Sequence, residues 1–218
     1  LWILQTRSGK RTSKSAVKIA VDMVREKLIN KNDAVLRVDP NSLDTLLHPT
    51  LDERSSIKVI ANGLPASPGA VSGKVVFSSE EAERLNDMMQ DTILVRVETS
   101  PEDIQGMHAA KGILTSRGGM TSHAAVVARG MGRPCVSGSS EIEINYDKKI
   151  FKTSSVEVKE GEIITIDGST GRIILGTVPT IKPEISGDFS KLMSWADKIR
   201  KLKVRTNSET PLDTKTAR

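Results

Sequence analysis

Apolar residues near the start of the chain recur at the spacing of one helix face. The predicted helix begins at Ser13 as its N-cap and ends near residues 30–32. Its apolar positions are Val17, Ala20, Val21, Val24 and Leu28. Residues 33–47 then predict two short helical turns, interrupted around the proline at position 40. This part of the chain has the character of a helical connector.

From residue 57 the pattern changes to short β-prone runs that alternate with brief helices. Strands are predicted at residues 71–77, 92–97, 113–115, 134–137, 163–166 and 172–175. Helices are predicted at residues 78–90, 100–111 and 121–131. The last two strands flank a turn at residues 167–171 and form a hairpin. This alternation predicts an α/β fold over residues 57–176.

A second helical pattern follows the α/β region. Its N-cap is Asp188, and its apolar stripe consists of Leu192, Trp195, Ile199 and Leu202. Residues 204–207 read as the start of a strand. The expected organisation is a helical connector at 13–56, an α/β domain at 57–176 and a linker helix within 177–203.

Composition limits the class of protein. The 218 residues are 37% hydrophobic and 27% charged, which supports a globular domain with a real core and excludes a disordered tail. No apolar run approaches the roughly 18 residues of a membrane helix, and no signal peptide is recognisable. The single cysteine, Cys135, lies in an apolar strand, so we expect it to pack in the core and to form neither a disulfide nor a zinc cluster. A reducing, cytosol-like compartment and an origin in a longer chain are expected.

The net charge of +5 raises the question of nucleic-acid binding. Residues 57–176 contain 13 basic and 15 acidic residues, so the basic excess lies in the flanks. The six aromatic residues are scattered and form no stacking surface. We therefore expect no nucleic-acid partner.

The segment after the strand at 113–115 contains the clearest candidate chemistry. Gly118 and Gly119 are followed by Thr121, Ser122 and His123 at the start of a small-residue helix. Glycines let the backbone approach a ligand, and the free N–H groups of a helix start favour a phosphate. The same field disfavours an imidazolium cation, so His123 is expected to be neutral and nucleophilic.

Two arginines flank this loop, and a simpler interpretation remains. Arg117 and Arg129 are candidates to neutralise phosphoryl oxygens. Alternatively, the segment is only a strand-to-helix turn with a hydroxyl cap and a surface histidine. His48 and His108 lack a glycine loop and are interpreted as structural. No carboxylate or second histidine lies at ligand spacing around His123, so no metal site is predicted.

The run from Gly118 to Gly132 resembles the phosphohistidine signature of the enzymes that make or use phosphoenolpyruvate (PEP). Within that family, Met120 and the residues at 128–132 are more similar to the pyruvate, phosphate dikinases than to PEP synthases or enzyme I of the sugar phosphotransferase system. Residues 4–7, 36–49 and 204–211 are also similar to dikinase segments.

This resemblance implies a swivelling β/β/α phosphohistidine domain at 57–176, with flanking helical linkers. Residues 1–12 are then the end of an ATP-grasp nucleotide-binding domain, and residues 204–218 are the start of a PEP/pyruvate-binding barrel. In these enzymes ATP pyrophosphorylates a histidine, and inorganic phosphate removes the outer phosphoryl group as pyrophosphate. The remaining phosphohistidine phosphorylates pyruvate.

The resemblance assigns roles to individual residues. His123 matches the phosphoryl acceptor, and Thr121 matches a regulatory phosphorylation site of plant members. The residues expected to stabilise phosphate are Arg117, Gly118, Gly119, Thr121, Ser122 and Arg129. The implied complete enzyme is a cytoplasmic or organellar homodimer that uses ATP, phosphate, pyruvate and Mg²⁺. This segment is expected neither to bind that Mg²⁺ nor to catalyse the overall reaction alone.

Two other interpretations stay open. The segment is alternatively the phosphohistidine domain of a PEP synthase or an enzyme I type protein. A non-enzymatic alternative is an interaction module that has kept the fold, in which His123 is inert.

Overall fold

A computed structural model describes residues 5, 9, 11–52, 54–181, 187–203 and 214–215. The chain divides into two compact units, one of residues 1–39 with 185–218 and one of residues 40–184. The predicted strand at 204–207, and most of the segments at 1–12 and 204–218, lie outside the described residues. No helix in the described ranges combines the length and apolar character that crossing a bilayer requires.

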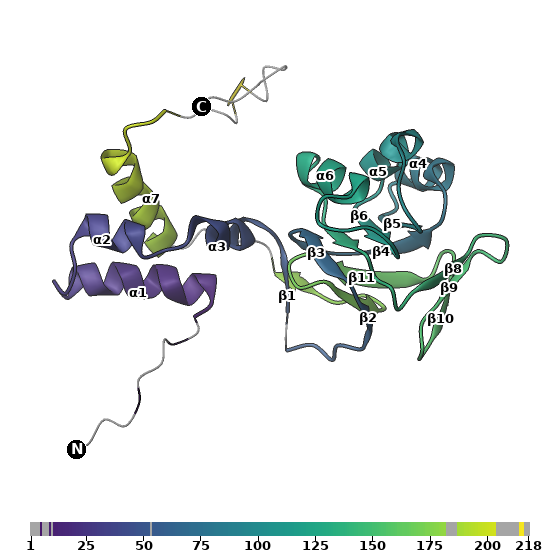
Figure 1. Cartoon of the computed structure of the whole chain (residues 1–218), viewed down its shortest axis with the longest axis horizontal. Coiled ribbons are helices and arrows are strands. Elements are labelled where there is room, and N and C mark those ends of the chain that lie inside the picture. Colours follow the sequence, from purple (N-terminus) through teal and green to yellow (C-terminus); the bar gives the residue numbers. More distant parts are fainter. Residues whose placement is uncertain are drawn as a thin grey trace. The chain divides into compact units, whose positions relative to one another are not determined.

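The first unit consists of helices from both flanks of the chain. They are α1 (Ser13–Arg25), α2 (Lys31–Leu36) and α7 (Gly187–Ile199), which lie side by side in Figure 1. Val17, Val21 and Leu192 are buried in this unit. The two predicted helical flanks therefore share one small core.

The boundaries of these helices differ from the prediction at four places. Asp188, the predicted N-cap of the last helix, lies inside the first turn of α7. The N-cap of α1 is Thr12, whose Oγ1 accepts a hydrogen bond from the backbone N–H of Ser15. The predicted helix to residue 30 ends at Arg25, because Lys27 adopts a left-handed backbone with φ 61° and α2 starts afresh. Leu202 lies beyond α7 and is 85% exposed, so it is not part of the buried stripe.

The second unit is built on an eight-stranded mixed sheet. Its strand order is β2-β12-β11-β4-β5-β6-β7-β3, and β4 to β7 run parallel. The strands are β2 (Val59–Asn62), β3 (Leu64–Ser67), β4 (Ala70–Val76), β5 (Thr92–Arg96), β6 (Gly112–Thr115), β7 (Cys135–Ser137), β11 (Ile163–Asp167) and β12 (Arg172–Leu175). The predicted hairpin is the antiparallel pair β11–β12.

Three helices connect the parallel strands and cover one face of the sheet (Figure 1). They are α4 (Ser79–Asp87), α5 (Ile104–Ala109), which a 3₁₀ turn at Pro101–Asp103 precedes, and α6 (His123–Gly130). Leu94 and Met107 belong to the core between helices and sheet, whereas Ile93 and Phe151 belong to the core on the opposite face. The predicted α/β fold is confirmed, since a parallel sheet with connecting helices forms the centre of the unit.

A three-stranded antiparallel sheet, absent from the predicted elements, covers part of the second face. It comprises β8 (Glu143–Asn145), β9 (Ile150–Lys152) and β10 (Glu157–Lys159). The turn between β8 and β9 places Tyr146 edge-on to Phe77, with ring centroids 6.4 Å apart. The phenol oxygen of Tyr146 accepts a hydrogen bond of 2.8 Å from the backbone N–H of Val97. The small sheet is thus attached to the end of β5.

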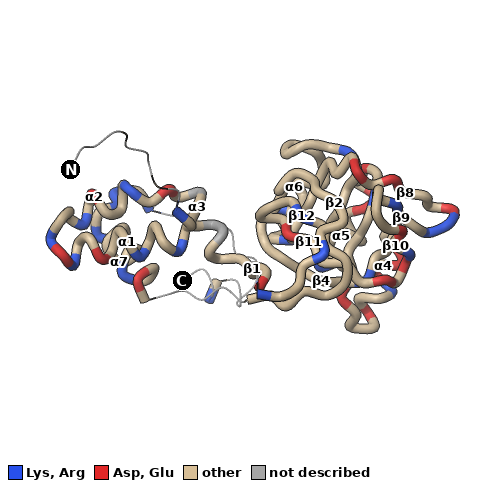
Figure 2. The backbone as a smooth tube through the Cα atoms, turned by 90° about the horizontal axis from the view of Figure 1, so that it is seen from below, with Lys and Arg blue, Asp and Glu red and all other residues tan. Residues whose placement is uncertain are grey.

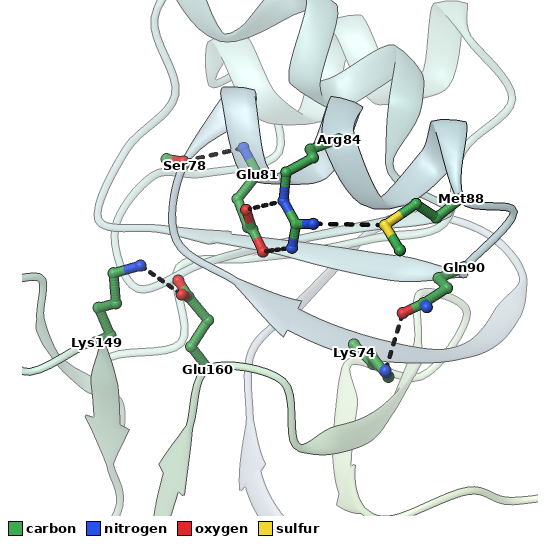
Figure 3. Close-up of polar contacts among 8 residues, drawn as sticks. All are labelled: Lys74, Ser78, Glu81, Arg84, Met88, Gln90, Lys149 and Glu160. Carbon is green, nitrogen blue, oxygen red and sulfur yellow. Dashed lines mark hydrogen bonds and ion pairs between the residues drawn. The ribbon is translucent and has the colours of Figure 1, made fainter.

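Polar side chains stabilise the start of α4 (Figure 3). Ser78, where the predicted helix 78–90 starts, is the N-cap, and its hydroxyl accepts a hydrogen bond from the backbone N–H of Glu81. The carboxylate of Glu81 pairs with Arg84 at 2.7 Å, and this hydrogen bond lowers the pKa of Glu81. Lys149 and Glu160 form a separate pair at 2.6 Å. Both basic side chains are fully exposed, so water screens these pairs and they contribute little to stability.

The α/β unit extends further in both directions than residues 57–176. β1 (Thr50–Leu51) pairs with β13 (Thr180–Ile181), so the chain is joined to itself outside the main sheet. α3 (Pro40–Asp44) and a 3₁₀ turn at Thr45–Leu47 precede this pair. Residues 40–56 of the expected connector therefore belong to the α/β unit, and residues 13–39 belong to the helical unit.

Basic and acidic residues are interspersed along both units (Figure 2). Several of them form ion pairs, such as Lys18 with Asp22 at 3.1 Å and Lys152 with Glu157 at 3.1 Å. Many of the basic side chains are therefore paired locally with acidic ones.

Candidate functional site

Helix α6 begins with His123 as its first residue. Its N-cap is Ser122, whose hydroxyl accepts a hydrogen bond of 3.4 Å from the backbone N–H of Ala125. The expected helix start at Thr121 is wrong by two residues, because Ser122 has the extended backbone of an N-cap and Thr121 lies outside the helix, exposed. His123 therefore occupies the position where backbone N–H groups lack helical partners.

The ring of His123 is half-buried and has a defined neighbour. Its Nδ1 lies 3.0 Å from Oγ1 of Thr99, a residue only 8% exposed in the loop that follows β5. Among the described residues, no other hydrogen-bond partner of the ring is found. The geometry leaves Nε2 as the ring nitrogen without a protein partner in this part of the chain.

Thr99 was not among the residues identified from sequence. It lies 24 positions before His123, and no local motif connects the two. The available signal is topological, since β5 and β6 are adjacent parallel strands whose carboxyl ends meet at one edge of the sheet.

The glycine loop between β6 and α6 packs against Gly138, which follows β7. Gly118 has φ 108°, and Gly138 after β7 has φ 64°. A Cβ added to Gly138 lies only 2.3 Å from the carbonyl oxygen of Gly118, so this contact requires glycine. Gly119, in contrast, faces open space, since nothing lies within 4 Å of an added Cβ. The loop therefore packs closely against Gly138 at Gly118 and is open to solvent at Gly119.

A chain of hydroxyl groups lies beneath the loop. The hydroxyl of Ser137, which is fully buried, is 3.3 Å from the hydroxyls of both Ser122 and Thr115. It also donates to the carbonyl of Gly119 at 3.4 Å. The cap of α6 is thereby connected to the ends of β6 and β7.

The two candidate arginines have different surroundings. The guanidinium of Arg129 donates from Nε to the carbonyl of Ala66 at 2.8 Å and from Nη2 to the carbonyl of Met120. It therefore holds the loop against β3. Arg117 is exposed and lines an open hollow of about 380 Å³ with residues such as Ser140 and Glu143. No contact with His123 is found for either arginine within the described residues.

Glu102 lies in the 3₁₀ turn that follows Ser100. A hydrogen bond from the side chain of Ser100 lowers the pKa of Glu102. Glu102 is fully exposed, so water screens its charge.

The remaining candidate nucleophiles lie elsewhere. His48 is half-buried and His108 is exposed on α5. Cys135 is fully buried, and burial raises the pKa of its thiol to about 12. Such a thiol is not a nucleophile near neutral pH, which agrees with its expected packing role.

In the described part of the chain, no three side chains of the types His, Cys, Asp and Glu converge to hold an ion. The Mg²⁺ implied by the resemblance therefore has no ligand set among these residues.

Comparison with known proteins places this geometry in a family. Residues 88–171 match the family described as "PEP-utilising enzyme, mobile domain". The whole chain is 60% identical to 24% of a pyruvate, phosphate dikinase from Rhizobium meliloti. It is also 56% identical to 25% of pyruvate, phosphate dikinase 2 from Zea mays, and 98% of it is 55% identical to 25% of the Clostridium symbiosum enzyme.

The chain thus spans about a quarter of the length of these relatives, which are larger enzymes. The matched domain is the mobile, phosphohistidine-bearing domain, a swivelling β/β/α fold. Residues 88–171 therefore belong to the mobile domain of the PEP-utilising enzymes, and the chain is similar along its whole length to one quarter of pyruvate, phosphate dikinase.

Proposed function

We propose that His123 accepts and transfers a phosphoryl group through Nε2. The observation that carries the proposal is the 3.0 Å contact between Nδ1 and the Thr99 hydroxyl, at the first residue of α6. When Nδ1 carries the proton and donates it to Thr99, the lone pair lies on Nε2. That lone pair attacks phosphorus, an N–P bond forms, and the bond from phosphorus to the leaving oxygen breaks with its electron pair on that oxygen.

The loop offers a suitable environment for the transferred group. Backbone N–H groups at the start of α6 and the open side of Gly119 allow phosphoryl oxygens to approach. Gly118 shapes the loop, and Ser122 caps the helix. We propose Arg117 and Thr121, both exposed, as the side chains that reach the phosphoryl oxygens, with Arg129 acting through the position of Met120.

At the level of the complete enzyme, we propose the dikinase reaction. ATP, phosphate and pyruvate are converted to AMP, PEP and pyrophosphate, and this segment carries the phosphoryl group between an ATP-grasp domain and a PEP/pyruvate-binding barrel. The support is the similarity to dikinases along the whole chain. Mg²⁺ dependence, a homodimeric assembly and a cytoplasmic location belong to the same proposal, and some relatives in plants are described as chloroplastic.

Thr121 is proposed as a regulatory phosphorylation site. It is exposed and lies two residues before His123. A phosphate there adds about −1.5 to −2 charges. That charge repels an incoming phosphoryl donor.

A hybrid enzyme tests the proposed function. In it, this chain replaces the matching quarter of the Rhizobium meliloti relative, and PEP formation from ATP, phosphate and pyruvate is measured. We expect activity in the hybrid, none with His123→Asn, and unchanged activity with His108→Asn as the matched control. Activity that survives His123→Asn contradicts the proposal.

A further inference from the structure

The loop at residues 97–103, between β5 and α5, is held at both ends. At its start, the carbonyl of Val97 accepts a hydrogen bond of 2.9 Å from the backbone N–H of Arg117. The backbone N–H of Val97 donates to Tyr146 Oη at 2.8 Å. The backbone before Thr99 is therefore fixed by two neighbouring elements, β6 and the turn between β8 and β9.

After Thr99, the group that holds the loop is the carboxylate of Asp103, which is only 4% exposed. Its Oδ2 accepts a hydrogen bond of 3.0 Å from the backbone N–H of Ser100. Its Oδ1 accepts one of 3.0 Å from the hydroxyl of Ser79 at the start of α4. Nε of Arg96 lies 3.4 Å from the same oxygen. A buried carboxylate is costly unless it is paired and hydrogen-bonded, and here both oxygens have donors.

We propose that Asp103 is a positioning residue for the phosphoryl acceptor. It fixes the backbone of Ser100 and thereby Thr99, whose hydroxyl orients the ring of His123. The proposal rests on the proposed function of His123, although Asp103 has no contact with the ring. A displacement of about 1 Å at Thr99 is enough to break a 3.0 Å hydrogen bond.

Phosphorylation rates of His123 in the hybrid enzyme test this connection. Asp103→Asn keeps the side-chain shape but removes the charge, and Thr99→Val removes the hydroxyl. We expect each to slow phosphorylation about tenfold, the effect of losing one productive hydrogen bond. Because both act through one contact, the double variant is also about tenfold slower. A hundredfold loss in the double variant, or no loss with Asp103→Asn, overturns the proposal.

A second measurement does not depend on phosphorylation. Nitrogen-15 NMR of the His123 ring in the chain itself reports which nitrogen carries the proton. We expect mainly Nδ1–H in the parent chain and a mixture of tautomers in Asp103→Asn. Ser79→Ala is a milder change that serves if the Asp103→Asn variant does not fold. It should shift the tautomer ratio of the His123 ring in the same direction.

An unchanged tautomer in these variants overturns the positioning role. A hybrid that is never phosphorylated, together with the expected tautomer shift, refutes the proposed function and supports the positioning role.

Discussion

The imidazole of His123 has two nitrogens in different surroundings. Nδ1 faces the hydroxyl of Thr99, and no described residue hydrogen-bonds to Nε2. We propose that this hydroxyl accepts from Nδ1–H and so leaves the lone pair on Nε2. In this proposal a single neighbouring side chain selects the nucleophilic atom.

The two hydroxyl residues before His123 have separable roles. Ser122 is the N-cap of α6, whereas Thr121 is exposed outside the helix. We expect Ser122→Ala to lower the free energy of unfolding by about 1 kcal/mol. Thr121→Ala should change it by less than about 0.5 kcal/mol. Urea denaturation of both variants measures the difference, and equal losses would contradict the assigned cap.

The reactivity of the Cys135 thiol tests whether this side chain is buried. Its thiol has a pKa of about 12 because it is desolvated. At pH 8 we expect iodoacetamide to label the folded chain about a thousandfold more slowly than the urea-unfolded chain, since the thiolate is the reacting form. Mass spectrometry follows the labelling. Comparable rates in the two states would place the thiol in contact with water.

The same thiol predicts a pH dependence of stability. Because its pKa is raised in the folded state, the unfolded chain releases the proton first as the pH rises. The free energy of unfolding should therefore be unaffected by this group below pH 8. Above about pH 9 it should fall by up to about 1.4 kcal/mol per pH unit. Cys135→Ala is the control, in which this component of the slope disappears.

At the scale of elements, the central strands of the main sheet were predictable, whereas its edge strands β2 and β3 and the small sheet were not. The strands β4, β5, β11 and β12 and the cap of α4 appear within one or two residues of their predicted positions. The three-residue strands β8 to β10 carry too little alternation to be recognised, and their pairing is decided by packing against the main sheet.

The candidate site follows the same division. The contiguous segment from Gly118 to His123 contains the glycine loop and the proposed acceptor, so both could be singled out from sequence, although the helix start was placed two residues too early. Thr99 and Gly138 come from other strand ends and meet the segment only after the parallel sheet forms. The left-handed residue Lys27, which ends α1, has no marker in the pattern either.

Gly138 and Gly132 form a matched pair of glycines. Both have φ 64°, but an added Cβ at Gly138 meets the backbone of Gly118, whereas nothing lies near Gly132. We expect Gly132→Ala to cost about 1–2 kcal/mol of backbone strain. Gly138→Ala should cost at least about 1 kcal/mol more, because the glycine loop must move. Urea denaturation measures both, and equal costs would argue against the close contact.

At the scale of the whole chain, each of the two units buries apolar residues of its own. The α/β unit is completed by the β1–β13 pair and by Leu51 and Val178, which pack against Ala70 and Ile174. This arrangement explains why the unit includes residues 40–184 and is larger than the sequence pattern indicates.

A chain of residues 40–184 should therefore melt in one cooperative transition. A chain of residues 57–176 lacks Leu51 and Val178, and we expect it to melt about 10 °C lower. Differential scanning calorimetry of the two chains makes the comparison. If the chain of residues 40–184 fails to fold alone, the α/β unit needs the helical unit for its stability.

The central claim is that Nε2 of His123 carries the phosphoryl group. The most direct measurement charges the hybrid enzyme with PEP, identifies the modified residue by mass spectrometry and assigns the nitrogen by phosphorus-31 NMR. The account predicts one phosphoryl group, on Nε2 of His123, and none in the His123→Asn variant. A phosphoryl group on Nδ1, on His48 or on His108 would contradict it.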